Sequence, residues 1–553
     1  MSYHSAQQPE KDFVENASGK IQAAQNPPPD TRALTTLPKQ SLQSQTGSSP
    51  GTRKFEKFEK FAFLGVLILA AIVRIWQLNS QPLQAYERIH STYAQLFLHD
   101  NLQHWQQCAG TAAPTCYHYN PAFHGPISYM IEAGIYQITQ WLSTPVNNTS
   151  LRLASALMGI MLVGLPYFLR SSLGRLPAWI ASLLLALSPS VVYFSRVARE
   201  DIFVSAFSLL LIVATVRYRQ THKLYWMLLS VSALVLAYAS KETTLLVMFL
   251  GISFGGALVI WESSNRWYIR SQPLSTRTNL ARWLPGTGAP YLLGMYIIGL
   301  GIAIRILLGW LISIGQAINK HPTATSDTLK QLNARTDFLL PWLGACLALV
   351  ALLLLFHEYL GHIKEGPATF VRRIDPERQP ILNMLAHTTW IYWFLSLVWG
   401  SILFIILFTA LFSNLHAGIG DGIWRATAYW LGQLQATHTT QPWYYYLQSM
   451  QLVEQISLLL ALMGILYSLR YPTYLRLWLS YWFLGTAIFY SWIGEKGPWL
   501  QLQILLPMLL LSALGIELIV RSYIQLRKNK RHIEQVGSII SIEEAIDNAT
   551  NNE

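Results

Sequence analysis

Six short polar clusters interrupt a sequence of 553 residues that is otherwise rich in apolar side chains. They are residues 84–90 (QAYERIH), 117–126 (YHYNPAFHGP), 195–201 (SRVARED), 241–242 (KE), 441–446 (QPWYYY) and 494–499 (GEKGPW). A carboxylate can take a proton from a hydroxyl, a cation can hold a phosphate, and an aromatic ring can stack on a sugar or a prenyl chain. If the clusters meet, their chemistry suits a lipid-linked sugar.

Several clusters also have a structural explanation. Lys241 and Glu242 could form an interfacial ion pair, which is as good an explanation as a functional role at such a helix end. The tyrosines of residues 444–446 fit an aromatic belt better than ligand contact. Glu200 and Asp201 are harder to explain structurally, because two carboxylates at a helix start exceed what capping needs.

The elements that must position these clusters are membrane helices. Only 12% of the residues are charged and 52% are hydrophobic, whereas an ordinary soluble domain is roughly 25% charged, so a soluble surface is excluded. Apolar blocks of about 17 to 25 residues match the length of a spanning helix. The net charge of +12 lies mainly in short segments between these blocks, which favours a topological role and argues against nucleic acid as a partner.

We predict an all-α integral membrane protein, a polytopic bundle of about 12 (11 to 13) transmembrane helices. The expected spans lie near residues 61–78, 151–169, 177–195, 201–217, 224–240, 243–261, 289–314, 338–356, 386–412, 443–468, 474–492 and 499–520. Basic connecting segments then alternate with the polar clusters. By the positive-inside rule, both termini are cytosolic and the clusters face outward from the cell membrane.

This prediction gives a disordered cytosolic tail (1–52), a membrane domain (53–520) and a cytosolic C-terminal tail (521–553). The first outer loop, residues 79–150, contains an ambiguous segment at 125–142, which is long enough to span but carries Glu132. We interpret it as a juxtamembrane helix with its apolar face in lipid. The alternative is a thirteenth span compensated by a missed one.

Two cysteines, Cys108 and Cys116, share the first outer loop. They are candidates for a disulfide if the loop faces an oxidising compartment, and free thiols otherwise. A metal site formed by Glu87, His90 and His124 has little support, because their spacing matches no known site. A divalent cation is possible and no cofactor is certain.

From residue 61 to 520 the chain resembles the GT-C superfamily of polyprenyl-phosphate-sugar glycosyltransferases. It looks similar to dolichyl-phosphate-mannose protein mannosyltransferases and their "flippase activity-associated" relatives. The most specific segments are residues 119–126, 188–201, 441–446 and 490–500. The resemblance implies a GT-C-like bundle in which the long first loop carries juxtamembrane helices.

Two departures from that family concern acids. The family's Asp-Glu-x-Ile-His pattern, whose Asp is the expected base, reads Tyr86-Glu87-Arg88-Ile89-His90 here. Its Tyr-Asp-Pro reads Tyr119-Asn120-Pro121. Neither a neutral phenol nor an amide readily takes a proton at pH 7.

The resemblance implies roles for the residues that remain. The candidate catalytic residues are Glu87, Glu200 and Asp201. The candidate substrate-binding residues, with Arg199, Lys241 and Lys496 expected to hold a phosphate, are His90, His124, Arg199, Lys241, Glu242, Glu495 and Lys496.

The function implied is transfer of a sugar, expected to be a hexose such as mannose, from a polyprenyl phosphate to a protein, lipid or glycan acceptor at the outer face. The alternative is an accessory protein that binds the lipid-linked sugar without turning it over, as the loss of two acids allows. A transporter ranks last, because the sequence shows no paired broken helices.

Overall fold

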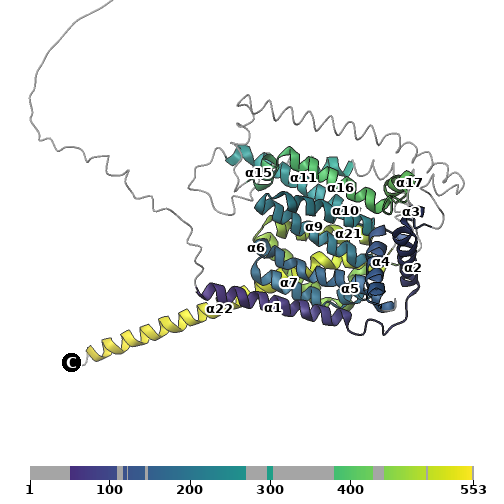
Figure 1. Ribbon diagram of the computed structural model, residues 1–553. Helices are drawn as coiled ribbons and strands as arrows, with labels where there is room; N and C mark the ends of the chain where they lie inside the picture. Colours follow the sequence, from purple (N-terminus) through teal and green to yellow (C-terminus); the bar gives the residue numbers. More distant parts are fainter. Residues whose placement is uncertain are drawn as a thin grey trace, which may run out of the picture. The chain divides into compact units, whose positions relative to one another are not determined.

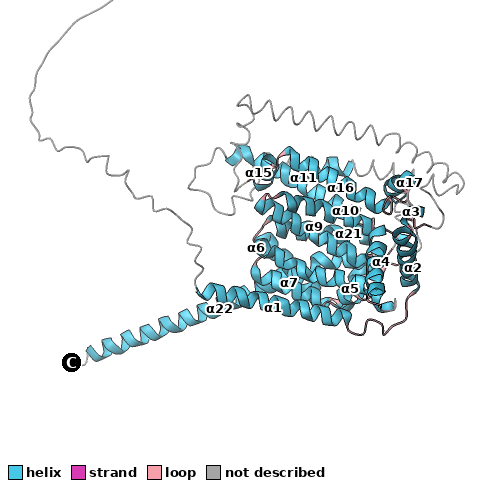
Figure 2. Cartoon of the chain, viewed as in Figure 1, coloured by secondary structure: helices cyan, strands magenta, loops and turns pink. Residues whose placement is uncertain are grey.

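The computed structural model describes residues 50–108, 116–120, 123–143, 147–269, 296–302, 379–426, 441–493 and 496–550. The chain divides into two units, Met1–Phe58 and Glu59–Glu553, and every site residue lies in the second. The described residues form helices and loops, with no strand among them (Figure 2).

Five described helices are long and apolar enough to cross a membrane: Asn148–Leu173, Asp201–Thr221, Thr244–Glu262, Trp390–Phe408 and Pro498–Arg531. In Figure 1 the first span runs from α5 (Asn148–Gly164) to the end of α6 (Arg170–Leu173). The second and fourth spans are α9 (Asp201–Thr221) and α16 (Trp390–Phe408). The third span is most of α11 (Thr244–Ile269), and the fifth includes the first part of α22 (Gln501–Thr550). The prediction of an all-helical polytopic membrane protein is confirmed. The expected span at 338–356 and most of the one at 289–314 lie outside the described residues.

Two other expected spans are broken rather than continuous. Residues 177–195 form α7 (Arg175–Leu187) and α8 (Pro189–Ser195), bent by 61°, and residues 443–468 form α19 (Tyr445–Val453) and α20 (Gln455–Arg470), bent by 110°. Pro189 explains the first break, since a proline disfavours helical geometry in the residue before it. The prediction of a continuous span in each of these two segments was therefore wrong.

The two breaks are joined to each other. The hydroxyl of Ser188, the residue at the first break, donates a hydrogen bond of 2.5 Å to Oε1 of Glu454, the residue at the second break. The carboxylate of Glu454 also accepts a hydrogen bond from the hydroxyl of Ser457. Backbone that leaves helical geometry within a membrane must find hydrogen-bond partners. Oε1 of Glu454 supplies one, because it accepts a hydrogen bond of 3.4 Å from the backbone N–H of Ser190.

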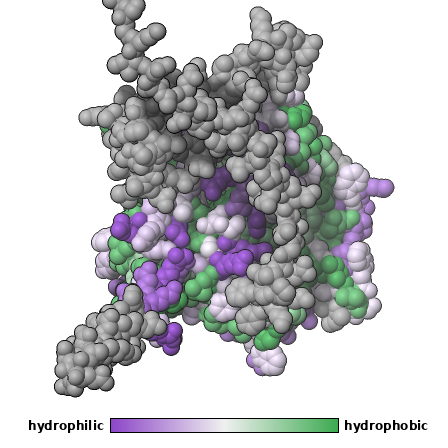
Figure 3. All heavy atoms as spheres, turned by 90° about the vertical axis from the view of Figure 1, so that its left-hand side faces the viewer, coloured by the Kyte–Doolittle hydropathy of each residue, from purple (hydrophilic) through white to green (hydrophobic). Residues whose placement is uncertain are grey.

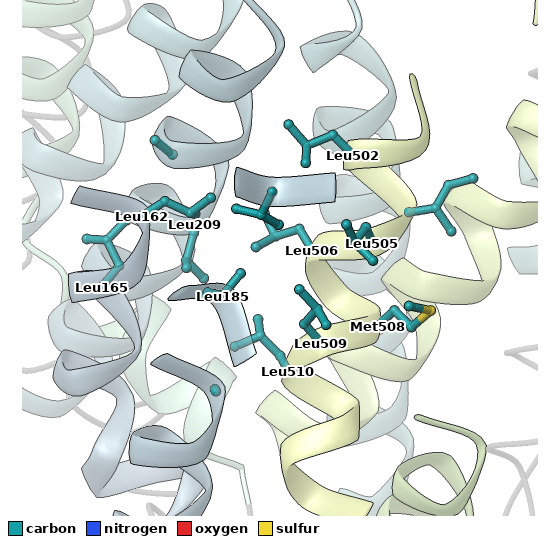
Figure 4. Close-up of a cluster of buried hydrophobic side chains, with 14 of the residues drawn as sticks. Leu162, Leu165, Leu185, Leu209, Leu502, Leu505, Leu506, Met508, Leu509 and Leu510 are labelled. Carbon is teal, nitrogen blue, oxygen red and sulfur yellow. The ribbon is translucent and has the colours of Figure 1, made fainter. Parts of the chain in front are cut away.

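The apolar core forms around α22. Leucines of α22 belong to one buried cluster with leucines of α5, α7 and α9, and Figure 4 shows Leu506, Leu509 and Leu510 on the side of α22 that faces Leu185 and Leu209. Two glycines let α20 and α22 approach closely. A Cβ added at Gly464 would lie 2.0 Å from the carbonyl oxygen of Leu511, and one at Gly515 would lie 2.1 Å from that of Leu460. Small residues at such crossings are typical of membrane helix pairs.

Segments predicted to be cytosolic share one end of the bundle. A cavity of about 330 Å³ is lined by residues from three of them (170–177, 217–223 and 470–476), among them Ser171, Arg219 and Thr473. Figure 3 shows the face of the molecule at this end, where hydrophilic side chains gather. Because α9 runs about 31 Å from Asp201 to Thr221, the acids at its start and Arg219 near its end lie at opposite ends of this helix.

The other end carries two helices of the first loop, α2 (Ala85–Leu96) and α4 (Pro126–Trp141) (Figure 1). The 16-residue α4, which is the ambiguous segment, is not among the candidate spans. It buries Tyr129, Glu132 and Tyr136 and exposes Ile138 and Trp141 near its end. The polar side of α4 thus points into the protein, where it meets α2 and α5.

Candidate active site

Glu87 anchors the first loop to the bundle. Its carboxylate lies 2.8 and 2.7 Å from Nε and Nη2 of Arg152 on α5, and it accepts hydrogen bonds from the backbone N–H groups of Gln84 and Ala198. Burial disfavours the charged carboxylate, but Arg152 and the two N–H groups outweigh it and lower the pKa of Glu87. This geometry fits a residue that fixes the loop better than the predicted catalytic base.

His90, one turn further along α2, bridges two carboxylates. Its Nδ1 lies 3.0 Å from Oε1 of Glu132 and its Nε2 lies 3.2 Å from Oε2 of Glu200, and all three side chains are fully buried. Burial favours the neutral imidazole, but the two carboxylates prevail and raise the pKa of His90 to about 9. At neutral pH the ring is therefore a buried cation with both nitrogens engaged.

Glu200 and Asp201, at the start of α9, share a buried lysine. The Nζ atom of Lys241 lies 2.8 Å from Oε1 of Glu200 and 2.9 Å from Oδ1 of Asp201, and Arg199 Nε donates to Oδ2 of Asp201 at 3.1 Å. Burial opposes ionisation of Glu200, but Lys241, His124, His90 and Arg199 hold its pKa well below the usual range. The adjacent acids are therefore part of an internal charge network.

His124, from the cluster 117–126, and Glu242, from the cluster 241–242, complete the network. Nδ1 of His124 lies 3.0 Å from Oε2 of Glu242, and the hydroxyl of Tyr119 donates to Oε1 of Glu242 at 2.7 Å. The backbone N–H of Gly125 donates to the carbonyl of Ser240, which docks this loop against the end of α10 (Leu224–Ser240). The side chain of His124 is 16% exposed, whereas that of Glu242 is 1% exposed.

Arg199 connects the network to the last loop. Its guanidinium carbon lies 4.3 Å from the ring centre of Tyr86 and 4.4 Å from that of Trp499, so it is held between two aromatic rings. Lys496 donates to the backbone carbonyl of Ile493 at 2.9 Å, while the candidate Glu495 lies outside the described residues. Arg199, Tyr86 and Trp499 are less deeply buried than the acids behind them, so they form an accessible edge of the network.

Most of the candidate residues therefore come together. Contacts of hydrogen-bond or ion-pair length join residues of four clusters, 84–90, 117–126, 195–201 and 241–242, and Trp499 brings in a fifth. The hydroxyl of Tyr446 donates to the carbonyl of Gly497, which links the remaining cluster to the last loop. Sequence reasoning missed the partners Arg152 and Glu132. Glu132 could have been found from the sequence, because it is the one acid in the largely apolar segment 125–142.

Within the described part of the chain, the proposed metal set of Glu87, His90 and His124 does not form a group of converging ligand atoms. The one such group there is His99, Asp100 and His104, whose ligand atoms lie within 4.8 Å of one another on the surface of the first loop. Cys108 and Cys116, in the same loop, form a disulfide.

Together, the helices and the buried charge network define a polytopic membrane protein with an enclosed polar site at one end of its bundle. Residues 124–276 of the chain match the family model described as dolichyl-phosphate-mannose-protein mannosyltransferase. The matched region contains His124, Glu200, Asp201, Lys241 and Glu242, and it confirms the resemblance that the motifs indicated.

Among solved structures, the chain is similar to the oligosaccharyltransferase of Archaeoglobus fulgidus tethered to an acceptor peptide containing the NVT sequon. The two are 13% identical with a TM-score of 0.42, and the match covers 84% of this chain and 50% of the other. The chain thus spans about half the length of that structure. No curated protein matches the sequence.

Proposed function

We propose that this protein is a membrane glycosyltransferase that takes a sugar from a polyprenyl-phosphate donor and passes it to a protein, lipid or glycan acceptor. The observation that carries the proposal is the buried network of His90, His124, Glu200, Asp201 and Lys241. Four of these five residues lie inside the region that matches the mannosyltransferase family. Ionisable residues buried at the ends of membrane helices are costly and are retained mainly for function.

The accessible edge of the network supplies donor-binding groups. Arg199 offers a cation for the donor phosphate, and the rings of Tyr86 and Trp499 on either side of it offer faces for a sugar or prenyl chain. Lys241 is assigned a different role from the one expected, because it is 2% exposed and already neutralised by Glu200 and Asp201. It holds the two acids in position.

The proposal includes a GT-C-like bundle of about 12 spans with its site on the extracytoplasmic side. The gathering of three predicted cytosolic segments around one cavity supports the predicted alternation of the loops. The disulfide between Cys108 and Cys116 agrees with an oxidising compartment on the side of the site.

The alternative is an accessory protein that binds the lipid-linked sugar but does not transfer it. The absence of the expected aspartate at Tyr86 favours this alternative. The phenol of Tyr86 is no substitute, since burial and the neighbouring Glu200 raise its pKa well above the usual range. Turnover therefore distinguishes the two functions.

The test uses the full chain, purified in lipid nanodiscs and supplied with synthetic polyprenyl-phosphate mannose or glucose. Acceptors are a threonine-rich peptide, an asparagine-sequon peptide, an alkyl glycoside and water. We expect release of polyprenyl phosphate with at least one donor–acceptor pair. Saturable donor binding without release in any combination would support the accessory function instead, and uptake of free sugar by proteoliposomes would indicate a transporter.

A further inference from the structure

We infer that His124, held by Glu242, is the general base that takes the proton from the acceptor hydroxyl. This inference rests on the proposed function and concerns the question that the sequence leaves open, which is what replaces the acid missing at Tyr86. The family match covers both residues, but neither stands at the position of the missing acid.

The acids of the network have their oxygens engaged. Glu87 accepts four hydrogen bonds from Arg152, Gln84 and Ala198. Glu200 faces Lys241 and Tyr86 with one oxygen and His90 with the other. A carboxylate stabilised as an anion in this way is a weak proton acceptor, because protonation would cost it these partners.

Asp201 and His90 are engaged in the same manner. The two oxygens of Asp201 face Lys241 and Arg199, and the two nitrogens of His90 face Glu132 and Glu200. His90 is also fully buried, so an acceptor hydroxyl could not reach it without opening the helix ends. Neither residue offers an atom to a substrate.

His124 differs from all of these in exposure and in the use of its nitrogens. Nδ1 faces Glu242 at 3.0 Å, while among the described residues Nε2 makes no hydrogen bond, its ion-pair distance to Oε1 of Glu200 being 3.5 Å. An Nδ1–H donated to a buried carboxylate leaves the lone pair on Nε2. The side chain of His124 is 16% exposed, whereas that of His90 is fully buried, so an acceptor hydroxyl can approach the ring of His124.

The backbone also fixes His124 in place. Its φ is +65°, in the left-handed region that is uncommon for residues other than glycine. Such a conformation is strained, so the contacts around it must compensate for its free-energy cost. Gly125 holds the loop here, since its N–H donates to Ser240 and a Cβ on it would lie 1.8 Å from the carbonyl oxygen of Ala239. Tyr119 and His124 both bind the carboxylate of Glu242, one at each oxygen.

In the proposed step, the acceptor loses its proton to His124 as the sugar is transferred. The acceptor O–H bond breaks and its proton goes to Nε2 of His124, while the oxygen electron pair forms a bond to C1 of the sugar. The bond between C1 and the phosphate oxygen breaks, and its electron pair stays on the polyprenyl phosphate, whose charge Arg199 faces. The imidazolium, stabilised by Glu242 and Glu200, then returns its proton to solvent or to the departing phosphate.

The experiment measures release of polyprenyl phosphate by the full chain with the donor–acceptor pair that gives turnover. We expect His124→Ala to lower kcat by about 100-fold or more while KM for the donor changes less than about threefold. Added imidazole should restore part of the lost rate, which a purely structural role would not allow. Glu242→Gln, which keeps a hydrogen-bond acceptor but removes the charge, should lower kcat by about tenfold.

The matched control is His222→Ala. His222 is also a histidine with a left-handed backbone, φ +52°, but it caps the opposite end of α9. It should keep the wild-type rate and respond to no imidazole. A rate for His124→Ala within about threefold of wild type, or a lost rate that imidazole does not restore in a variant that still binds donor, would overturn the inference. Absence of turnover by the wild-type chain would instead contradict the proposed function and the inference together.

Discussion

Nε2 of His90 lies 3.2 Å from Oε2 of Glu200, so a histidine of the first loop contacts the carboxylate that precedes α9. The other ring nitrogen reaches Glu132 on α4 at 3.0 Å. A single buried ring thus connects three elements that are far apart in the sequence. These contacts are ion pairs only while the imidazole ring of His90 is protonated.

The stability of the protein should therefore depend on pH through His90. Because the folded-state pKa of about 9 lies above the ordinary value of 6.5, the stabilisation is fully present below about pH 6.5 and is lost as the pH rises through 9. We expect the free energy of unfolding to fall by up to about 3 kcal/mol across this interval. Melting temperatures in nanodiscs from pH 6 to 10 measure the change.

His90→Gln provides the comparison, since it keeps a polar side chain but cannot gain a proton. Its melting temperature should vary less with pH over the same interval than that of the wild type. Identical slopes for the two proteins would show that His90 is not the titrating group.

The pair of Glu87 and Arg152 should behave as a buried ion pair. Removing the cation by Arg152→Met leaves a buried carboxylate without its bidentate partner and should destabilise the fold by about 3 to 5 kcal/mol. The double variant with Glu87→Gln should recover part of this loss because no uncompensated charge remains. Thermal melts of both variants test the pair, and a double variant less stable than Arg152→Met would contradict it.

Gly125 should be required for a steric reason. Adding a Cβ there places it 1.8 Å from the backbone oxygen of Ala239, so Gly125→Ala must push the loop away from α10. We expect lower stability and loss of turnover, measured by melting and by release of polyprenyl phosphate. Gly134→Ala on α4 is the matched control, because nothing lies within 4 Å of its added Cβ. Equal effects of the two substitutions would contradict the packing described for this loop.

The sequence predicted the helical class, and it singled out most residues of the candidate site, because both depend on local signals. Apolar length identifies a span, and charge at the mouth of a span stands out against its surroundings, as at Glu200 and Lys241. It did not predict the two breaks, although Pro189 was a local signal for the one at Ser188. The break at Glu454 has no such signal, and its partner Ser188 is 266 positions away. It also missed the partner of Glu87, because Arg152 is 65 positions away and no local pattern pairs the two residues.

The roles of Glu87 and His124 likewise depend on partners that are distant in the sequence. The sequence predicted a catalytic role for Glu87 and a substrate-binding role for His124. The residues that hold them, Arg152 and Glu242, are 65 and 118 positions away. A carboxylate held by a guanidinium and an imidazole held by a carboxylate have opposite tendencies to accept a proton. Spacing along the chain does not reveal which arrangement each residue has.

Turnover of the variants Glu200→Gln and Glu517→Gln, measured as release of polyprenyl phosphate from its sugar, shows whether the network is the active site. Both carboxylates are buried and paired, Glu200 with Lys241 in the network and Glu517 with Arg521 on α22. If the network is the active site, Glu200→Gln should lower turnover by about 100-fold or more while Glu517→Gln stays within about threefold of wild type. Equal turnover by the two variants would contradict the assignment of the active site to this network.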